Sequence, residues 1–418
     1  MRWMKAVFGL LQAGRHRKPD GFWRYAAIAL ALMTAVFEFV ALTRLRHNPY
    51  ILGVAFLSLM LPIVFILHGA RPTSKEKPSV PDIILILLSL AAGIYVVSHS
   101  EYFLTRWPMA SPLSPADLFF GVVIFVISFE SCRRTFGTGL TSVVLVAVLY
   151  AVFGHLLPGA FSHTKISLPG FIDQMSYTLN GVMGSPLQTA ATYIFVFVTF
   201  GIFLDASGGG EFFFNLANAA AGKAVGGQAK VTAIACGLYG MISGSPTSDT
   251  VTVGSFAIPN MKRAGYDSVY AGAVTAVAAT GGAIVPPVMG AAAFLMAELT
   301  GIPYADIAVA AIIPAVFYYL GILLQVHFHT LRTNPLTDTS IDTESLKAVL
   351  KQSYYLLPLV ILVIMLFKGF TPVYAGIIAI LSTVVVSWTR KQTRMGLTTR
   401  PCQPSPRRWR WRPMRRQE

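Results

Sequence analysis

The chain has 418 residues, of which 54% are hydrophobic and only 12% are charged, and its mean hydropathy is +0.61. This composition argues against a soluble globular protein and predicts an all-α polytopic membrane protein. The formal net charge of +15 gathers beside the apolar runs and at the C-terminus. It therefore indicates membrane orientation and contact with anionic lipid, and no nucleic-acid partner is expected.

Six apolar runs of near-spanning length come first, at 25–42, 51–67, 83–99, 118–132, 139–157 and 189–204. Basic residues precede the first run, fill the loop at 70–82 and follow the fourth run: Arg15, Arg17, Lys18, Arg71, Lys75, Lys77, Arg133 and Arg134. By the positive-inside rule, the N-terminus is expected in the cytoplasm. Arg44 and Arg46 are an exception, because in this topology they would face outward. Three later runs follow at 305–328, 353–368 and 372–388. About ten membrane segments are expected in all, together with the re-entrant hairpin and the broken helix described next.

Two polar interruptions stand in apolar sequence between residues 243 and 287. The first, SGSPTSDT, has apolar arms of about a dozen residues, too short to span, so a re-entrant hairpin is expected at 231–260. The second, TGGAIVPP, cannot continue a helix, so a broken helix is expected at 268–299. Such breaks leave backbone N–H and C=O groups without helical hydrogen bonds, and hydrocarbon offers these groups no partner. The two breaks therefore predict a buried polar site.

The two breaks combine oxygen ligands with helix ends, which suits a cation bound together with an anionic solute. The predicted ion- and substrate-binding residues are Ser243, Gly244, Ser245, Thr247, Ser248, Asp249, Thr250, Thr280, Gly281, Gly282 and Pro286. Within this set Na⁺ is expected at Ser245, Asp249, Thr280 and Gly281. The alternatives are a surface loop whose small residues only allow tight helix packing and, for the aspartate, an interfacial helix cap.

Other polar residues give weaker indications of a functional site. Glu38 lies inside the first run and is either a proton relay or, as we favour, a carboxylate hydrogen-bonded to a neighbouring helix. Glu130 lies one turn before two arginines, which predicts an ion pair. His327 and His329 diverge on a helix, which argues against a shared metal. Without a Walker loop or a Ser/His, paired-aspartate or zinc constellation, neither an enzyme nor a cofactor is expected.

Five motifs carry a family resemblance: GGQAK at 226–230, SGS at 243–245, GSFAIPNMKRAGY at 254–266, TGG at 280–282 and PPVMGAAAF at 286–294. They resemble the fused permease of tripartite ATP-independent periplasmic (TRAP) transporters, in the branch served by TAXI-type solute-binding proteins. The chain departs from the family pattern at PTSD in 246–249, at Thr275 and at Ala279.

The resemblance implies a scaffold-like membrane domain at 1–135 and the first repeat of a transport domain at 136–330. A cytoplasmic loop and the start of a second repeat follow at 331–388, and a basic, disordered tail at 389–418. The resemblance also implies elevator-type, Na⁺-driven symport of an organic anion, namely a carboxylate. A TAXI-type binding protein would deliver this solute through the bacterial periplasm to the permease in the inner membrane.

The family has two inverted repeats, of which this sequence supplies one. The tail rich in Arg, Pro and Trp therefore suggests an out-of-frame replacement of the second repeat. Such a truncation predicts that the chain alone does not transport. The alternative function is accordingly a truncated, non-transporting membrane scaffold or a degenerate permease.

Overall fold

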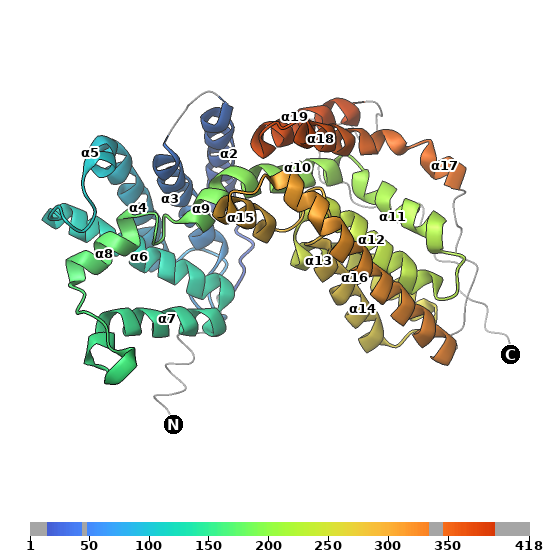
Figure 1. Ribbon diagram of the computed structural model, residues 1–418, viewed down its shortest axis with the longest axis horizontal. Coiled ribbons are helices and arrows are strands. Elements are labelled where there is room, and N and C mark those ends of the chain that lie inside the picture. Colours follow the sequence, from blue (N-terminus) through green and yellow to red (C-terminus); the bar gives the residue numbers. More distant parts are fainter. Residues whose placement is uncertain (1–14, 44–47, 334–345, 389–418) are drawn as a thin grey trace. The chain divides into compact units, whose positions relative to one another are not determined.

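The computed structural model describes residues 15–43, 48–333 and 346–388, and every regular element in these ranges is a helix (Figure 1). These residues form two compact units, one ending at Thr192 and the other beginning at Tyr193. Within the described ranges, seven helices are long and apolar enough to cross a membrane. The prediction of an all-helical polytopic membrane protein is therefore confirmed, while the predicted tail at 389–418 lies outside the described residues.

The first unit is built around the packing of α3 against α2 and α4, and of α6 against α4 and α8. Two of its helices, α3 and α6, begin with proline, which lacks the N–H that a first helical turn leaves unbonded anyway. Its helices are α2 (Phe22–Thr43), α3 (Pro49–Leu67), α4 (Val80–Ser98), α5 (Ser100–Thr105), α6 (Pro115–Phe136), α7 (Thr138–Phe153), α8 (Leu168–Tyr177) and α9 (Ser185–Thr189), with short 3-10 turns at Gly154–Leu156 and Gly159–Phe161.

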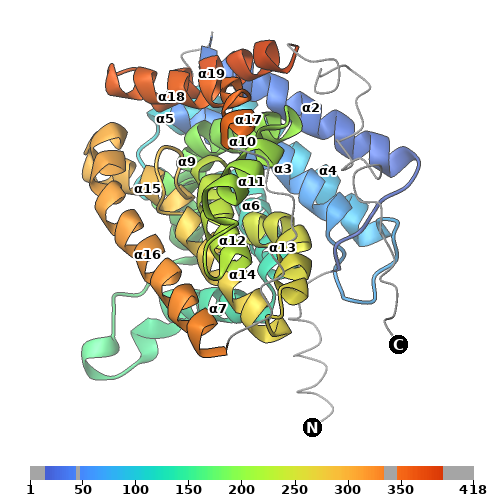
Figure 2. The same cartoon turned by 90° about the vertical axis from the view of Figure 1, so that its right-hand side faces the viewer.

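The second unit has α12 at its centre, packed against α11, α13, α14 and α16 (Figure 2). Small side chains fill much of this core, so the helices approach closely. Its helices are α10 (Phe195–Ala206), α11 (Gly209–Ala221), α12 (Gly227–Ser243), α13 (Pro246–Arg263), α14 (Ser268–Gly282), α15 (Ala291–Thr300), α16 (Tyr304–Thr333), α17 (Leu346–Leu350), η4 (Ser353–Leu356), α18 (Leu357–Phe367) and α19 (Pro372–Ser387); a π-helical stretch, η3 (Ala190–Ile194), connects α9 to α10.

The hairpin arms α12 and α13 are longer than the sequence-based expectation. They have 17 and 18 residues rather than about a dozen, because α12 also takes in residues 227–230 before the expected arm, and α13 begins within the polar tip at Pro246 and continues to Arg263. The last two apolar runs are helical over nearly the expected ranges, at Ser353–Phe367 (η4 and α18) and Pro372–Ser387 (α19). Both are shorter than the roughly 20 residues of a typical membrane-spanning helix.

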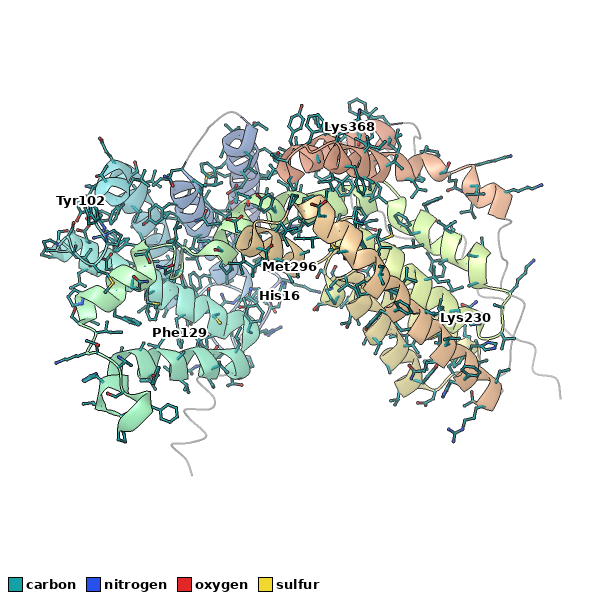
Figure 3. All side chains as sticks on the ribbon, viewed as in Figure 1. His16, Tyr102, Phe129, Lys230, Met296 and Lys368 are labelled. Carbon is teal, nitrogen blue, oxygen red and sulfur yellow. The ribbon has the colours of Figure 1, made fainter. Side chains whose placement is uncertain are left out.

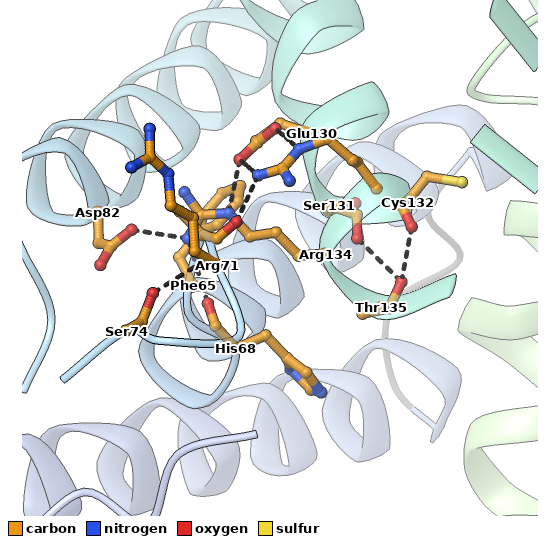
Figure 4. Close-up of polar contacts among 12 residues, drawn as sticks. Phe65, His68, Arg71, Ser74, Asp82, Glu130, Ser131, Cys132, Arg134 and Thr135 are labelled. Atoms are coloured by element: carbon orange, nitrogen blue, oxygen red, sulfur yellow. Dashed lines mark hydrogen bonds and ion pairs between the residues drawn. The ribbon is translucent and has the colours of Figure 1, made fainter. Parts of the chain in front are cut away.

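A buried cluster of charges joins four chain segments of the first unit (Figure 4). Asp82, at the start of α4, accepts a hydrogen bond from Arg17 at 2.8 Å on one carboxylate oxygen and from Arg134 at 2.6 Å on the other. All three side chains are at most 2% exposed. The two arginines also donate to the carbonyl oxygens of Phe65 and His68 at the end of α3, at 3.2 and 3.1 Å. This cluster therefore fixes the ends of α3, α4 and α6 to the segment before α2.

Glu130 extends the cluster along α6. Its carboxylate accepts hydrogen bonds at 2.7 Å from both Arg133 and Arg134. The ion pair predicted from their spacing is confirmed. Arg134 is thus held between two carboxylates, those of Glu130 and Asp82.

Candidate functional site

The first polar interruption forms a tight turn between two helices. α12 ends at Ser243 and α13 begins at Pro246, and Gly244 between them has a φ of +58°, a conformation that glycine adopts without strain. Ser245 caps α13 by accepting the Ser248 N–H at 3.4 Å. The run SPTSDT is therefore the cap and first turn of a helix rather than a loop.

Asp249 is the buried carboxylate of this turn, with an exposed fraction of 2%. Its Oδ1 accepts the hydroxyl hydrogen of Ser243 at 2.5 Å, and the same hydroxyl oxygen accepts the Ser245 N–H at 3.0 Å. Its Oδ2 is buried without a hydrogen-bond partner among the described residues. An ionised carboxylate is costly in such surroundings unless a cation or a proton neutralises it.

The second interruption separates α14 from α15, and protein groups bind the backbone that it frees. The Gly290 N–H donates to the Ala283 carbonyl at 2.7 Å. The hydroxyl of Tyr304, on α16, donates to the Pro287 carbonyl at 2.9 Å and also contacts the Val288 carbonyl. Irregular backbone at membrane depth needs such partners, and here the chain itself supplies them.

The hairpin turn and this break lie against each other. The Val288 N–H donates to the Met241 carbonyl of α12 at 3.3 Å. A Cβ at Gly244 would overlap the carbonyl oxygen of Met289, so the turn approaches the break at backbone contact. The two interruptions, which are separated in sequence by α13 and α14, therefore form one site.

Below the turn, α12 and α14 touch through two glycines. A Cβ built on Gly282 would lie 2.7 Å from the Cα of Gly240. The same Cβ would lie 3.4 Å from Asp249 Oδ2 and 3.4 Å from the carbonyl oxygen of Cys236. The absence of a side chain at Gly282 thus allows α12 and α14 to meet beside two oxygens, one of which is the carboxylate oxygen without a hydrogen-bond partner among the described residues.

The predicted residues of the second break are not all directed at the hairpin, because successive residues on a helix point about 100° apart. Thr280 is exposed, and its hydroxyl donates to the Ala276 carbonyl of its own helix at 2.8 Å. A Cβ on Gly281 would lie 3.1 Å from the ring of Tyr319, so this glycine faces α16. Only Gly282 of the three faces Asp249.

The predicted residues of the hairpin turn also divide into two sets. Ser243, Ser245 and Asp249 are joined by hydrogen bonds or by the cap of α13, whereas Thr247 and Ser248 are exposed. The Thr250 hydroxyl donates to the Pro246 carbonyl at 2.7 Å. Pro286, in the break, is half-buried.

Two residues that shape this site were not anticipated from the sequence. Gly240 lies four residues before Gly244 in an apolar stretch, a spacing that is typical of closely packed membrane helices and could have identified it. Tyr304 binds the break from a separate helix, and its ring stacks on Phe294 at 4.5 Å between centroids. No local sequence signal marks this role of Tyr304.

Replacing Gly240 with alanine should lower the stability of the protein by about 1–3 kcal/mol, because the new methyl group would overlap the Cα of Gly282. Gly272→Ala on α14 is the matched control, since nothing lies within 4 Å of a Cβ at that glycine. The melting temperature in detergent should fall for Gly240→Ala and stay level or rise slightly for Gly272→Ala. Equal melting temperatures for the two variants would contradict the close contact of α12 with α14.

The structure also decides two other predictions. Glu38 is 0% exposed, and neither of its carboxylate oxygens has a hydrogen-bond partner among the described residues, so the predicted hydrogen bond to a neighbouring helix is wrong. His327 lies 3.3 Å from the ammonium of Lys230, which is labelled in Figure 3, whereas His329 stacks on Tyr270 at 3.7 Å between centroids. The two histidines diverge as predicted.

Comparison with known proteins identifies several relatives of this chain. The chain is 28% identical over 195 residues to the C4-dicarboxylate TRAP transporter large permease protein DctM of Pseudomonas aeruginosa, covering 46% of this chain and 45% of the relative. It is 28% identical over 217 residues to the sialic acid TRAP transporter permease protein SiaT of Haemophilus influenzae, covering 51% of this chain and 34% of the relative. A third relative is the isethionate TRAP transporter permease protein DctMQ of Oleidesulfovibrio alaskensis, 34% identical over 91 residues that cover 22% of this chain and 14% of the relative.

The matched segments cover less than half the length of each of these relatives. A family model, the DctM component of the tripartite ATP-independent periplasmic transporter, matches residues 123–401. This match includes the hairpin turn, the broken helix and Tyr304. The relatives are transport proteins rather than enzymes, in agreement with the prediction from the sequence. The chain therefore belongs to the DctM component family of the tripartite ATP-independent periplasmic transporters.

Proposed function

We propose that this chain is a permease component of a secondary active transporter, which couples inward movement of an organic anion to a Na⁺ gradient. Asp249 supports this function: it is a buried carboxylate that lies where a helical hairpin meets a broken helix, and one of its oxygens has no hydrogen-bond partner among the described residues. Buried acids in membrane segments that lack a protein partner are typical of ion pathways. A core-packing aspartate would instead be fully hydrogen-bonded.

Na⁺ suits this position because it prefers oxygen ligands, and oxygens of Asp249 and Cys236 each lie 3.4 Å from the position that a Cβ of Gly282 would take. The carbonyl of Cys236 has a second lone pair beyond its helical hydrogen bond. Thr280 and Gly281 face elsewhere, so we centre the proposed cation site on Asp249 and Gly282. The proposal requires that the ion lie at the contact of α12, α13 and α14, and that movement of the hairpin turn alter its binding.

The solute and the partner are proposed from chemistry and family. Two relatives are named for C4-dicarboxylate and for sialic acid, both carboxylates, which supports an organic anion as the solute. We further propose that a periplasmic solute-binding protein of the TAXI type delivers it to the bacterial inner membrane. The N-terminus then lies in the cytoplasm, on the side where Arg17, Asp82 and Arg134 meet.

Uptake into proteoliposomes tests the proposal. We expect accumulation of labelled carboxylates only with an inward Na⁺ gradient and a cognate binding protein, and loss of this uptake in Asp249→Asn. The matched control is Thr247→Ala, which changes an exposed hydroxyl on the same turn. Uptake that Asp249→Asn leaves intact would reject the ion site. If uptake appeared only after a second repeat was added to the chain, the alternative of a non-transporting scaffold would be favoured.

A further inference from the structure

Glu38 stands out among the acids of the first unit. It lies on α2, on the buried side of the helix together with Thr34 and Ala41. The opposite side of α2 exposes large apolar side chains: Leu32, Met33, Val36 and Val40. Glu38 therefore lies within the apolar, membrane-spanning part of α2, on the side of the helix that is buried, and α2 packs against α3.

The other buried or half-buried acids of this unit have partners, whereas Glu38 has none among the described residues. Asp82 and Glu130 are held by arginines, Asp173 pairs with Arg106, and Asp117 accepts the Tyr95 hydroxyl at 2.7 Å. For Glu38, no cation and no hydrogen-bond donor contacts either oxygen in the described part of the chain. An unpaired ionised carboxylate in such surroundings would cost many kcal/mol, so the group remains in its neutral form.

We propose that Glu38 is an uncharged carboxylic acid within the membrane and a site of covalent modification by lipid-soluble carbodiimides. Such reagents react with the protonated form of an acid, and they dissolve in hydrocarbon. Glu38 suits both properties, because it is uncharged and lies in a membrane-spanning helix. Only 17% of the spanning window of α2 is buried, so most of this helix faces away from the unit, and brief local opening of its contact with α3 would admit a reagent from the lipid.

The chemistry is an addition that loses no atom. A carboxyl oxygen of Glu38 bonds to the central carbon of the carbodiimide, while the carboxyl proton moves to one of its nitrogens. The resulting O-acylisourea rearranges by transfer of the acyl group to the other nitrogen, which gives a stable N-acylurea. The modified peptide therefore gains the mass of one whole reagent molecule.

The experiment treats the full chain, reconstituted in proteoliposomes, with dicyclohexylcarbodiimide near pH 7.5 and maps adducts by peptide mass spectrometry. An ordinary glutamate carries its proton in only about one molecule in a thousand at this pH. We therefore expect the Glu38 peptide to be modified at least about tenfold more than the peptides of Glu101, which is exposed, and Glu130, which is ion-paired. A water-soluble carbodiimide should modify Glu38 far less than the lipid-soluble reagent.

Two further samples serve as controls for the identity of the modified residue and for the need for folded protein. Glu38→Gln, a neutral side chain of similar shape, should retain the elution profile and melting temperature of the parent protein and lose the adduct. Protein unfolded in detergent at the same pH should lose the preference for Glu38. The proposal is overturned if folded protein shows no Glu38 adduct, or if the water-soluble reagent modifies Glu38 as fast as the lipid-soluble one.

Discussion

Asp249→Asn should abolish the stabilisation that Na⁺ gives to the purified protein. The substitution keeps the shape of the side chain and an oxygen for the Ser243 hydroxyl, but it removes the charge beside Gly282 that we propose binds the cation. At Na⁺ concentrations a hundredfold above the dissociation constant, binding to the folded state stabilises it by about 2.7 kcal/mol. The parent protein should therefore melt at a higher temperature in Na⁺ than in choline at equal ionic strength, and Asp249→Asn should melt equally in both.

The control for this prediction is Thr247→Ala, which should retain the full Na⁺ effect because its hydroxyl is exposed. This measurement needs no solute and no binding protein, so it tests the ion site separately from transport. An equal Na⁺ effect in parent protein and Asp249→Asn would place the coupling ion elsewhere. A Na⁺ effect lost in both variants would point to general damage to the turn.

Asp82→Asn should have the largest effect on stability, lowering it by about 3–5 kcal/mol, because it leaves two buried arginines without their shared counter-charge. Arg17 and Arg134 are 1% and 2% exposed, so water cannot replace the lost carboxylate. Unfolding in mixed micelles with increasing denaturing detergent, followed by tryptophan fluorescence, measures the change.

Two comparisons sharpen this second prediction. Glu76→Gln breaks an exposed ion pair with Arg15 and should leave stability unchanged within error, since exposed pairs contribute little. The double variant Asp82→Asn/Arg134→Gln should lose less than the sum of the two single variants, because both singles remove the same interaction. Strict additivity would show that the two charges act independently and that the cluster is not a single unit.

The class of the protein and the positions of its interruptions follow from the sequence alone. Apolar runs of this length are expected to be helices in a membrane, because an α-helix satisfies all its backbone polar groups within a single segment. SGSPTSDT and TGGAIVPP, which cannot continue such a helix, were expected to mark turns or breaks, and α12 is separated from α13, and α14 from α15, at these places. The i, i+3 and i, i+4 spacing of Glu130 with two arginines likewise determined a local ion pair.

Only the tertiary structure decided which side chains meet. Thr280, Gly281 and Gly282 are neighbours in sequence, yet the rotation of α14 turns only Gly282 toward Asp249. Asp82 finds Arg17 and Arg134 across distances of 65 and 52 residues along the chain. Glu38, which by its sequence could have found a partner on the adjacent helix, has none in the part of the chain that the structure describes. Local composition determines whether a segment is helical, but the direction of each side chain depends on the packing of helices that are distant in sequence.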